Sequence, residues 1–283
     1  MLCRLMFFKN EIEARLALIG NLSEAAREIT LSLFVKDMPV INKAQKGYDP
    51  VTQADIDAER VLRELIIKAF PKDAVEGEEL PDIAGKNDWL WTLDPIDGTR
   101  AFVAGVPVWS TLIAVSYKGA PVLGLIDVAA QDKRFWGRLD DGDERAWLEE
   151  GQQTSNLSTR NCAELSQAIL GCTEPLAMLN EQELQNYNKI RRQVRFSRLG
   201  LDAFGYGLLA QGRIDVIIEA LLKPCDVRAL IPVIEGAGGK LINWEGGSAV
   251  DGGRVVAVGD ARRLPEIVGV LGPWSCAIGS LRL

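Results

Sequence analysis

The chain contains no histidine among its 283 residues, and this absence excludes several classes of active site. Ser-His-Asp triads, Cys-His nucleophiles, HExxH zinc sites and phosphohistidine chemistry all require an imidazole. Any metal site must therefore use carboxylates, carbonyl oxygens, waters or thiols. Oxygen ligands of this kind favour Mg²⁺, Mn²⁺ or Ca²⁺.

Cysteine is sparse, and its spacing excludes two further kinds of site. The five cysteines, none in a CxxC pair, are Cys3, Cys162, Cys172, Cys225 and Cys276. An odd, scattered set predicts neither a disulfide framework nor a zinc site, so free thiols in a reducing cytoplasm are expected. No run of about 20 apolar residues is present to cross a bilayer. Arg4 and Lys9 interrupt the apolar N-terminus, so no signal peptide is predicted.

Composition describes an ordinary globular chain with an acidic balance. It is 47% hydrophobic and 25% charged, which is enough to bury a full-sized core in one large domain or two closely packed ones. The net charge of −7 and the isoelectric point of about 4.9 argue against nucleic acid or an anionic membrane as the main partner.

Hydrophobic periodicity predicts two helices, then a meandering sheet, then alternating helices and strands. The predicted helices span 10–34, 55–70, 181–193, 202–210, 226–237 and 265–271. The predicted strands span 89–93, 110–117, 121–128, 134–138, 168–172, 215–219, 240–243 and 255–258. The polar stretches 43–50 and 137–161 are predicted to be loops. Layers of helix and sheet are the expected architecture.

The central chemical signal is the segment WTLDPIDGT, in which an apolar strand ends in two carboxylates, Asp94 and Asp97. Pro95 predicts a turn between them. Gly98 and Thr99 are typical of the start of a short helix, whose N–H groups would then face an anion. The segment therefore predicts a metal site beside an anion site. The competing interpretation is an Asp-rich turn that caps a helix.

Two other segments add carboxylates to this edge. Glu78 lies in an acidic run after a short apolar strand at 74–75, and the alternative for it is a solvated loop. Asp226 follows Lys223 and a proline at the start of a predicted helix, where it could be a metal ligand, an N-cap, or both. The glycine-rich segment 235–240 follows a helix and precedes a strand, the wrong order for a P-loop, so it is interpreted as a helix stop.

Together these segments resemble the inositol monophosphatase superfamily over roughly residues 16–271. Lys43 with the DPVTQAD segment that ends at Asp55 resembles the family's early PVTxAD motif. GEE at 77–79 and DPIDGT at 94–99 match in full, and KPCD followed by GAGG resembles the family's WD…EAGG block. Cys225 stands where the family usually has Trp.

The resemblance implies an α/β fold, a layered αβαβα sandwich, usually in a homodimer. The single domain at 1–283 would have a helix-plus-antiparallel-sheet half at about 1–150 and an α/β half at about 151–283. The resemblance also implies two or three Mg²⁺ ions, for which Mn²⁺ can substitute, and inhibition by Li⁺. The implied metal ligands are Glu78, Asp94, the carbonyl of Ile96, Asp97 and Asp226. The implied catalytic residues are Glu78, Asp94, Thr99, Asp55 and Lys43, and Gly98 with Thr99 would hold the phosphate.

The expected reaction is hydrolysis of a small phosphate monoester by a water that Glu78 and Thr99 orient and deprotonate. The segment LGLDAFGY at 199–206 resembles the histidinol-phosphate phosphatase branch, with Leu201 in place of a glycine. Histidinol phosphate is cationic away from its phosphate, so Asp202 and Glu219 are expected to form an acidic wall. The full set expected to bind substrate is Gly200, Asp202, Glu219 and Asp226.

Three other interpretations are compatible with the sequence. Asp202 could instead cap the helix that it begins. The substrate could be an inositol monophosphate, which offers only hydroxyls, or, as a third choice, a nucleotide-type or sugar bisphosphate. The chain could also be a non-catalytic regulatory binding protein on the same fold.

Overall fold

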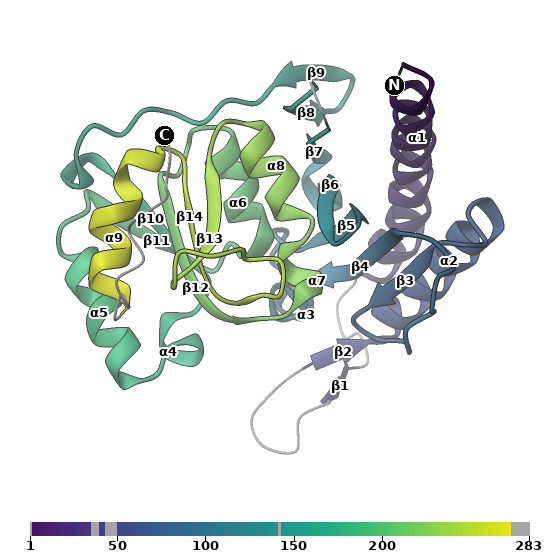
Figure 1. Cartoon of the computed structure of the whole chain (residues 1–283). Coiled ribbons are helices and arrows are strands. Elements are labelled where there is room, and N and C mark those ends of the chain that lie inside the picture. Colours follow the sequence, from purple (N-terminus) through teal and green to yellow (C-terminus); the bar gives the residue numbers. More distant parts are fainter. Residues whose placement is uncertain (1, 35–39, 43–49, 141–142, 273–283) are drawn as a thin grey trace.

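Two β-sheets and three helical layers alternate through the computed structural model, which describes residues 2–34, 40–42, 50–140 and 143–272 (Figure 1). The outer helices α1 and α2 cover one face of a seven-stranded sheet, and α6 and α8 lie between this sheet and a five-stranded one. α5 and α9 cover the far face of the second sheet. The fold is thus the expected αβαβα sandwich. Helices of the described residues are α1 (Leu2–Leu33), α2 (Gln53–Ala69), α3 (Thr99–Ala104), α4 (Pro175–Met178), α5 (Glu181–Arg191), α6 (Asp202–Ala210), α7 (Pro224–Val227), α8 (Leu230–Gly236) and α9 (Leu264–Leu271).

The seven-stranded sheet is antiparallel except at one edge. Its order is β3-β4-β5-β6-β7-β8-β9, and only β3 and β4 pair in parallel. Its strands are β3 (Ala74–Gly77), β4 (Trp89–Asp97), β5 (Ser110–Tyr117), β6 (Ala120–Val128), β7 (Lys133–Arg138), β8 (Arg145–Glu150) and β9 (Gln153–Asn156).

The second sheet is mixed, with the order β11-β10-β12-β14-β13. β10 pairs in parallel with β11 and β12, and β14 is antiparallel to both of its neighbours. Its strands are β10 (Ile169–Cys172), β11 (Phe196–Leu199), β12 (Val216–Leu222), β13 (Lys240–Asn243) and β14 (Gly253–Val258). A separate pair, β1 (Val40–Asn42) and β2 (Pro50–Thr52), precedes α2.

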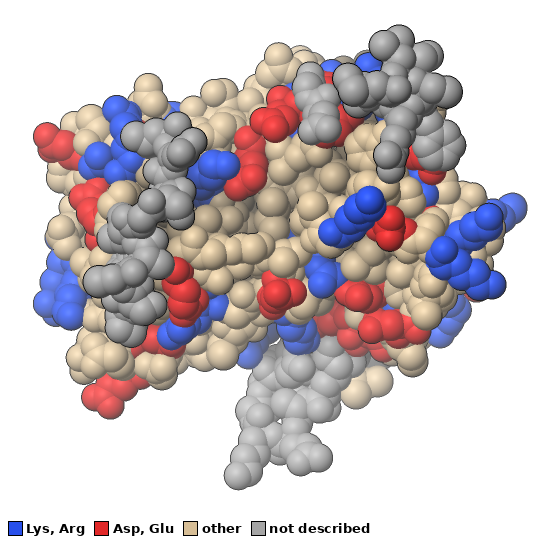
Figure 2. Space-filling model, viewed as in Figure 1, with Lys and Arg blue, Asp and Glu red and all other residues tan. Residues whose placement is uncertain are grey.

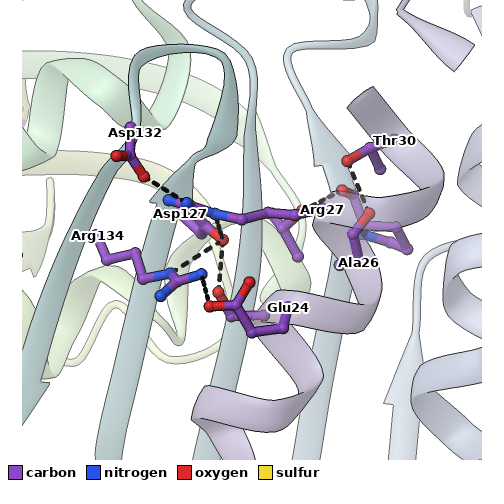
Figure 3. A network of polar contacts seen from close by, with 10 residues as sticks. Glu24, Ala26, Arg27, Thr30, Asp127, Asp132 and Arg134 are labelled. Atoms are coloured by element: carbon purple, nitrogen blue, oxygen red, sulfur yellow. Dashed lines mark hydrogen bonds and ion pairs between the residues drawn. The ribbon is translucent and has the colours of Figure 1, made fainter. Parts of the chain in front are cut away.

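An ion pair between half-buried Arg27 and buried Asp127 joins α1 to the first sheet in addition to apolar contacts (Figure 3). The guanidinium of Arg27 donates to both oxygens of Asp127 in β6 at 2.8–3.0 Å and to Asp132 at 2.6 Å. Ser23 donates a further hydrogen bond to Asp127 at 2.6 Å. Asp127 is fully buried, and these donors replace the water that it loses. They therefore set the position of the helix along the strands.

Glycines bring α8 close to the first sheet. A Cβ on Gly124 of β6 would lie 2.2 Å from the carbonyl oxygen of Ala229, and one on Gly137 of β7 would lie 2.1 Å from the backbone of Pro232 and Val233. The end of α8 is similar, because a Cβ on Gly236 would lie 2.4 Å from the carbonyl oxygen of Arg145. The glycine-rich segment is thus a helix stop with close backbone packing, as predicted.

The structure corrects three predictions of local structure. The predicted loop at 137–161 contains β8 and β9, whose side chains are largely half-buried or exposed and therefore gave a weak pattern. The chain does not turn at Pro95, because β4 continues to Asp97 with an irregular register against β5. The helix predicted at 226–237 is two short helices, α7 and α8. β11 was not predicted.

The surface carries both signs of charge. On the face shown in Figure 2, acidic and basic side chains are interspersed. No helix in the described part of the chain is long and apolar enough to cross a membrane.

Paired glycine substitutions test the close packing of α8. Gly137→Ala should lower the free energy of unfolding by about 2–3 kcal/mol, because backbone on both sides of the contact must move. Gly20→Ala in α1 is the matched control. A Cβ there meets nothing within 4 Å, so the variant should gain about 0.5–1 kcal/mol from helix propensity. Urea denaturation measures both, and equal effects of the two variants would contradict the packing described.

Candidate active site

Parallel pairing of β3 and β4 brings two carboxylates to one edge of the first sheet. Glu78 directly follows β3, and Asp94 lies near the carboxyl end of β4. α7, which follows β12 of the second sheet, adds Asp226 and Cys225. One ligand atom from each of these four residues lies within 4.8 Å of the other three. The site is therefore assembled from both sheets.

Asp94 carries the clearest indication of a bound cation. The residue is 1% exposed, and its Oδ1 has no hydrogen-bond partner. Burial raises the pKa of its carboxyl well above the ordinary value, and the charges of Glu78, Asp97 and Asp226 raise that pKa further. A buried carboxylate without a donor is costly unless a proton or a cation compensates it. Clustered carboxylate oxygens suit Mg²⁺, so these residues fit the metal that the sequence predicts.

The rest of the DPIDGT segment connects β4 to α3. Asp97 accepts a hydrogen bond from the backbone N–H of Ala203 at 2.7 Å. This bond ties the end of β4 to the first turn of α6. Gly98 precedes α3 with φ of 79°, a left-handed conformation that glycine adopts without a steric cost. The hydroxyl of Thr99 donates to the carbonyl of Ile96 at 3.1 Å, which leaves the second lone pair of that carbonyl for another partner.

Lys223 supplies the local positive charge of the cluster. Its ammonium donates to Glu78 at 2.8 Å, and its backbone N–H donates to Asp226 at 2.7 Å. Asp226 is the third residue of α7, and its carboxylate accepts a hydrogen bond from the backbone N–H of the N-cap residue, Lys223. Asp226 is therefore not itself the N-cap. No role was predicted for Lys223, because its partner Glu78 lies 145 residues away in the sequence. The only local signal was its position in the KPCD segment.

Asp55 lies in the first turn of α2 and forms a capping box with Thr52 at the start of that helix. Its carboxylate accepts from the backbone N–H of Thr52 at 2.8 Å and from the Thr52 hydroxyl at 2.6 Å. Burial raises the pKa of Asp55 to about 6, and the charges of Glu79 and Glu78 raise it too. Asp55 is thus within the electrostatic field of the cluster. Lys43, which was predicted with it, lies outside the described residues.

A pocket of about 70 Å³ adjoins Asp97 and Asp226. Four acidic residues line it together with polar and apolar ones. The lining is Asp97, Thr173, Met178, Asp202, Ala203, Tyr206, Glu219, Leu222, Asp226 and Leu230. The structure therefore brings Asp202 and Glu219 together beside the carboxylate cluster. Gly200 is not part of this lining; its φ is 71°, and its N–H donates to the carbonyl of Thr173 at 2.9 Å.

The two acidic residues of the predicted wall differ in their surroundings. Both oxygens of Glu219 accept hydrogen bonds, from the N–H of Thr173 at 2.7 Å and from the hydroxyl of Tyr206 at 2.8 Å. Burial raises the pKa of Glu219 to about 7. Sequence reasoning did not identify Tyr206 or Thr173, because only the fold brings them to Glu219.

Asp202 is the first residue of α6 and has φ of 48°, in the left-handed region that few residues other than glycine adopt. α6 has no side-chain cap, so the alternative role of Asp202 as a helix cap is not found. Burial raises the pKa of Asp202 to about 6, and the charge of Arg100 acts against this shift. A strained residue beside a cluster of charges is a common feature of functional sites.

Comparisons with known proteins agree with this fold. The Inositol monophosphatase family matches residues 13–269. The bifunctional phosphatase IMPL2 of Arabidopsis thaliana is 39% identical over 239 residues, which cover 82% of this chain and 65% of that protein. The histidinol-phosphatase of Chlorobaculum parvum is 32% identical over 87% of this chain and 92% of that protein. An inositol monophosphatase structure from Zymomonas mobilis, 33% identical, has a TM-score of 0.78 and covers 92% of this chain and 98% of that one.

A layered sandwich with carboxylates at its strand ends and a family match over most of its length defines the chain as a phosphatase. It belongs to the inositol monophosphatase family.

The buried acids predict how the stability of the metal-free protein depends on pH. Burial raises the pKa of Asp55 and Asp202 from 3.8 to about 6 and that of Glu219 from 4.5 to about 7. Between the ordinary and the raised values the folded chain holds protons that the unfolded chain has released. The free energy of unfolding therefore falls as the pH rises through this range. Urea denaturation in a chelator should give a value at least about 1 kcal/mol lower at about pH 8 than at about pH 5. A flat or opposite profile would contradict these environments.

Asp94→Asn removes one of the repelling charges. The metal-free variant should gain about 1 kcal/mol in the free energy of unfolding at about pH 8, because the amide can donate to neighbouring carboxylates. Phosphatase activity should fall by about a thousandfold or more, an effect of about 4 kcal/mol. Asp88→Asn, at the opposite end of β4, is the control and should change neither property appreciably. Near-full activity of Asp94→Asn would refute the assignment.

Proposed function

We propose that the chain hydrolyses histidinol phosphate in a Mg²⁺-dependent reaction. The observation that carries this proposal is the pocket in which Asp202 and Glu219 adjoin Asp97 and Asp226. Such a pocket places acidic groups beside the point where a phosphate would be bound. Relatives that carry the name histidinol-phosphatase support it, among them the Chlorobaculum parvum protein.

The carboxylate cluster would hold the metal. The proposed ligands are Glu78, Asp94, the carbonyl of Ile96, Asp97 and Asp226, for two or three Mg²⁺ ions or for Mn²⁺ in their place. When bound, these ions supply positive charge to the phosphate and to the departing alkoxide. The unpartnered Oδ1 of Asp94 is the observation in favour of this ligand set.

The chain's own residues position the reactants. The backbone N–H groups of Gly98 and Thr99 hold phosphate oxygens where β4 passes into α3, as donors at the first turn of a helix do. Glu78 accepts a proton from the attacking water, and the hydroxyl of Thr99 orients that water. The water oxygen then bonds to phosphorus, the ester P–O bond breaks, and the leaving oxygen takes up the proton that Glu78 accepted and becomes the alcohol. Asp55 and Lys43 belong to the proposed catalytic set, Asp55 through its charge.

The acidic charge of the pocket is the reason to prefer histidinol phosphate over inositol phosphate as the substrate. Histidinol phosphate has an amine and an imidazole, so it is cationic away from its phosphate, whereas inositol phosphate offers hydroxyls. Asp202 is the proposed direct partner of the cation. Glu219 contributes its charge from a fixed position, since its two oxygens already accept hydrogen bonds. Gly200 allows the turn that presents Asp202, and Asp226 contacts both metal and substrate.

We also propose a pathway, an inhibitor, an oligomeric state and a cellular compartment for the enzyme. We place the reaction in histidine biosynthesis and expect inhibition by Li⁺ and a homodimer, as the family resemblance implies. We also place it in the cytoplasm, in keeping with the free thiols of Cys162, Cys172 and Cys225.

Phosphate release with Mg²⁺ from histidinol phosphate and from inositol 1-phosphate tests the proposal. The ratio of kcat/KM should favour histidinol phosphate by roughly a hundredfold, which is about 2.7 kcal/mol of differential transition-state binding. A preference for inositol 1-phosphate would retain the metal mechanism and refute the argument from charge.

Asp202→Asn tests the direct partner. This variant should lose at least about tenfold in kcat/KM for histidinol phosphate, or about 1.4 kcal/mol, while inositol 1-phosphate should lose less than about threefold. Asp88→Asn is again the control for a change of net charge. An equal loss for both substrates would show that Asp202 supports the site and does not select the substrate.

A further inference from the structure

Cys225 lies within the carboxylate cluster and not merely near it. Its Sγ is within 4.8 Å of an oxygen of Glu78, of Asp94 and of Asp226. The thiol donates to Oδ1 of Asp226 at 3.4 Å. The cysteine is 9% exposed, so its sulfur is held on the inner side of the site.

A second, independent observation indicates that this space takes a cation. Oδ1 of Asp94 belongs to a side chain that is 1% exposed, and it has no hydrogen-bond partner. Asp94 also supplies an oxygen to the group of ligand atoms that includes the cysteine sulfur. The sulfur of Cys225 therefore lies close to the carboxylates of Glu78, Asp94 and Asp226.

The composition of this group differs from an all-oxygen Mg²⁺ site. Sulfur is a soft ligand that favours Zn²⁺ and related ions over Mg²⁺. Zinc accepts one sulfur at about 2.3 Å and carboxylate oxygens at about 2.0–2.2 Å in a tetrahedron, so the ligand atoms would be roughly 3.3–3.8 Å apart. Ligand atoms already within 4.8 Å of one another need only small side-chain movements to reach that geometry.

We propose that Cys225 gives this site a second mode of metal binding, in which a thiophilic divalent cation such as Zn²⁺ or Cd²⁺ is held by the sulfur of Cys225 and one oxygen each of Glu78, Asp94 and Asp226, in competition with Mg²⁺. This inference rests on the cation site of the proposed function. On binding, a metal–sulfur bond forms, the S–H bond breaks, and the proton passes to solvent. The ion replaces the hydrogen bond from the thiol to Asp226. Zn²⁺ would then displace Mg²⁺ and act as an inhibitor of the phosphatase.

Titration of the metal-free, full-length protein with Cd²⁺ tests this mode, because cadmium–thiolate bonds absorb in the ultraviolet. We expect a charge-transfer band that saturates at one ion per chain in the wild type and is lost in Cys225→Ser and Cys225→Ala. The ratio of Cd²⁺ to Mn²⁺ affinity should fall by at least about tenfold in both variants. Cys162→Ser is the matched control, since that thiol is buried but donates to the carbonyl of Glu164, and it should keep the band.

Further measurements separate failure of this inference from failure of the proposed function. Thermal unfolding confirms that each variant is folded, and Mn²⁺ affinity of Asp94→Asn tests the cation site itself. A full band in both Cys225 variants, with Mn²⁺ binding that depends on Asp94, would overturn the sulfur ligand alone. Absence of Mn²⁺ binding to the wild type would overturn the cation site and the proposed function with it. Protection of Cys225, but not Cys162, from alkylation by Cd²⁺ would support the sulfur ligand, and the reverse pattern would refute it.

Discussion

Mutual repulsion among clustered carboxylates is the constraint on which the rest of the site depends. Asp94 is buried near the carboxyl end of β4, Asp97 is half-buried at that end, and Asp226 and Glu78 approach Asp94 from other elements. Burial and like charge both raise the pKa of Asp94. The ammonium of Lys223 offsets only part of this charge. A bound cation would compensate both the burial of Asp94 and the repulsion among the carboxylates, and this relief contributes to its binding free energy.

The scaffold holds these charges in place through backbone donors. The N–H of Ala203 fixes Asp97 from the second layer of helices, and the N–H of Lys223 fixes Asp226 from the end of β12. α6 and α8 are packed between the two sheets, and glycine contacts set the distance of α8 from the first of them. The site therefore depends on the relative position of both sheets. A change in the packing of α8 would move Asp226, because Asp226 lies on α7, the helix that directly precedes α8.

Local chemistry made the carboxylate cluster at the end of β4 predictable from the sequence. The DPIDGT segment combines a strand end, two carboxylates and a helix start within a few residues, and each feature has a local cause. The helices with regular apolar spacing were also predictable. β8 and β9 were not, because the residues of β9 are all exposed and β8 buries only two of its six residues. Pro95 was misleading, because an irregular stretch of β4 accommodates it without ending the strand.

Contacts between distant segments could not be predicted in the same way. Lys223 pairs with Glu78 across 145 residues of sequence. Glu219 was expected to form an acidic wall with Asp202, and nothing in the sequence indicated that Tyr206 and Thr173 would hydrogen-bond to both of its oxygens. The position of Cys225 before Asp226 placed it beside the site, but the approach of its sulfur to Glu78 and Asp94 depends on distant segments. Each of these features arises from the way the second sheet meets the first, which no short segment encodes.

The location of a bound ion is the most direct test of the account. A crystal structure with Mn²⁺, recorded at the manganese absorption edge, would show the ion by its anomalous scattering. The account predicts an anomalous peak within coordination distance, about 2.0–2.3 Å, of Oδ1 of Asp94, with oxygens of Glu78 and Asp226 close by. Peaks confined to surface carboxylates, with Oδ1 of Asp94 left without a partner, would contradict it.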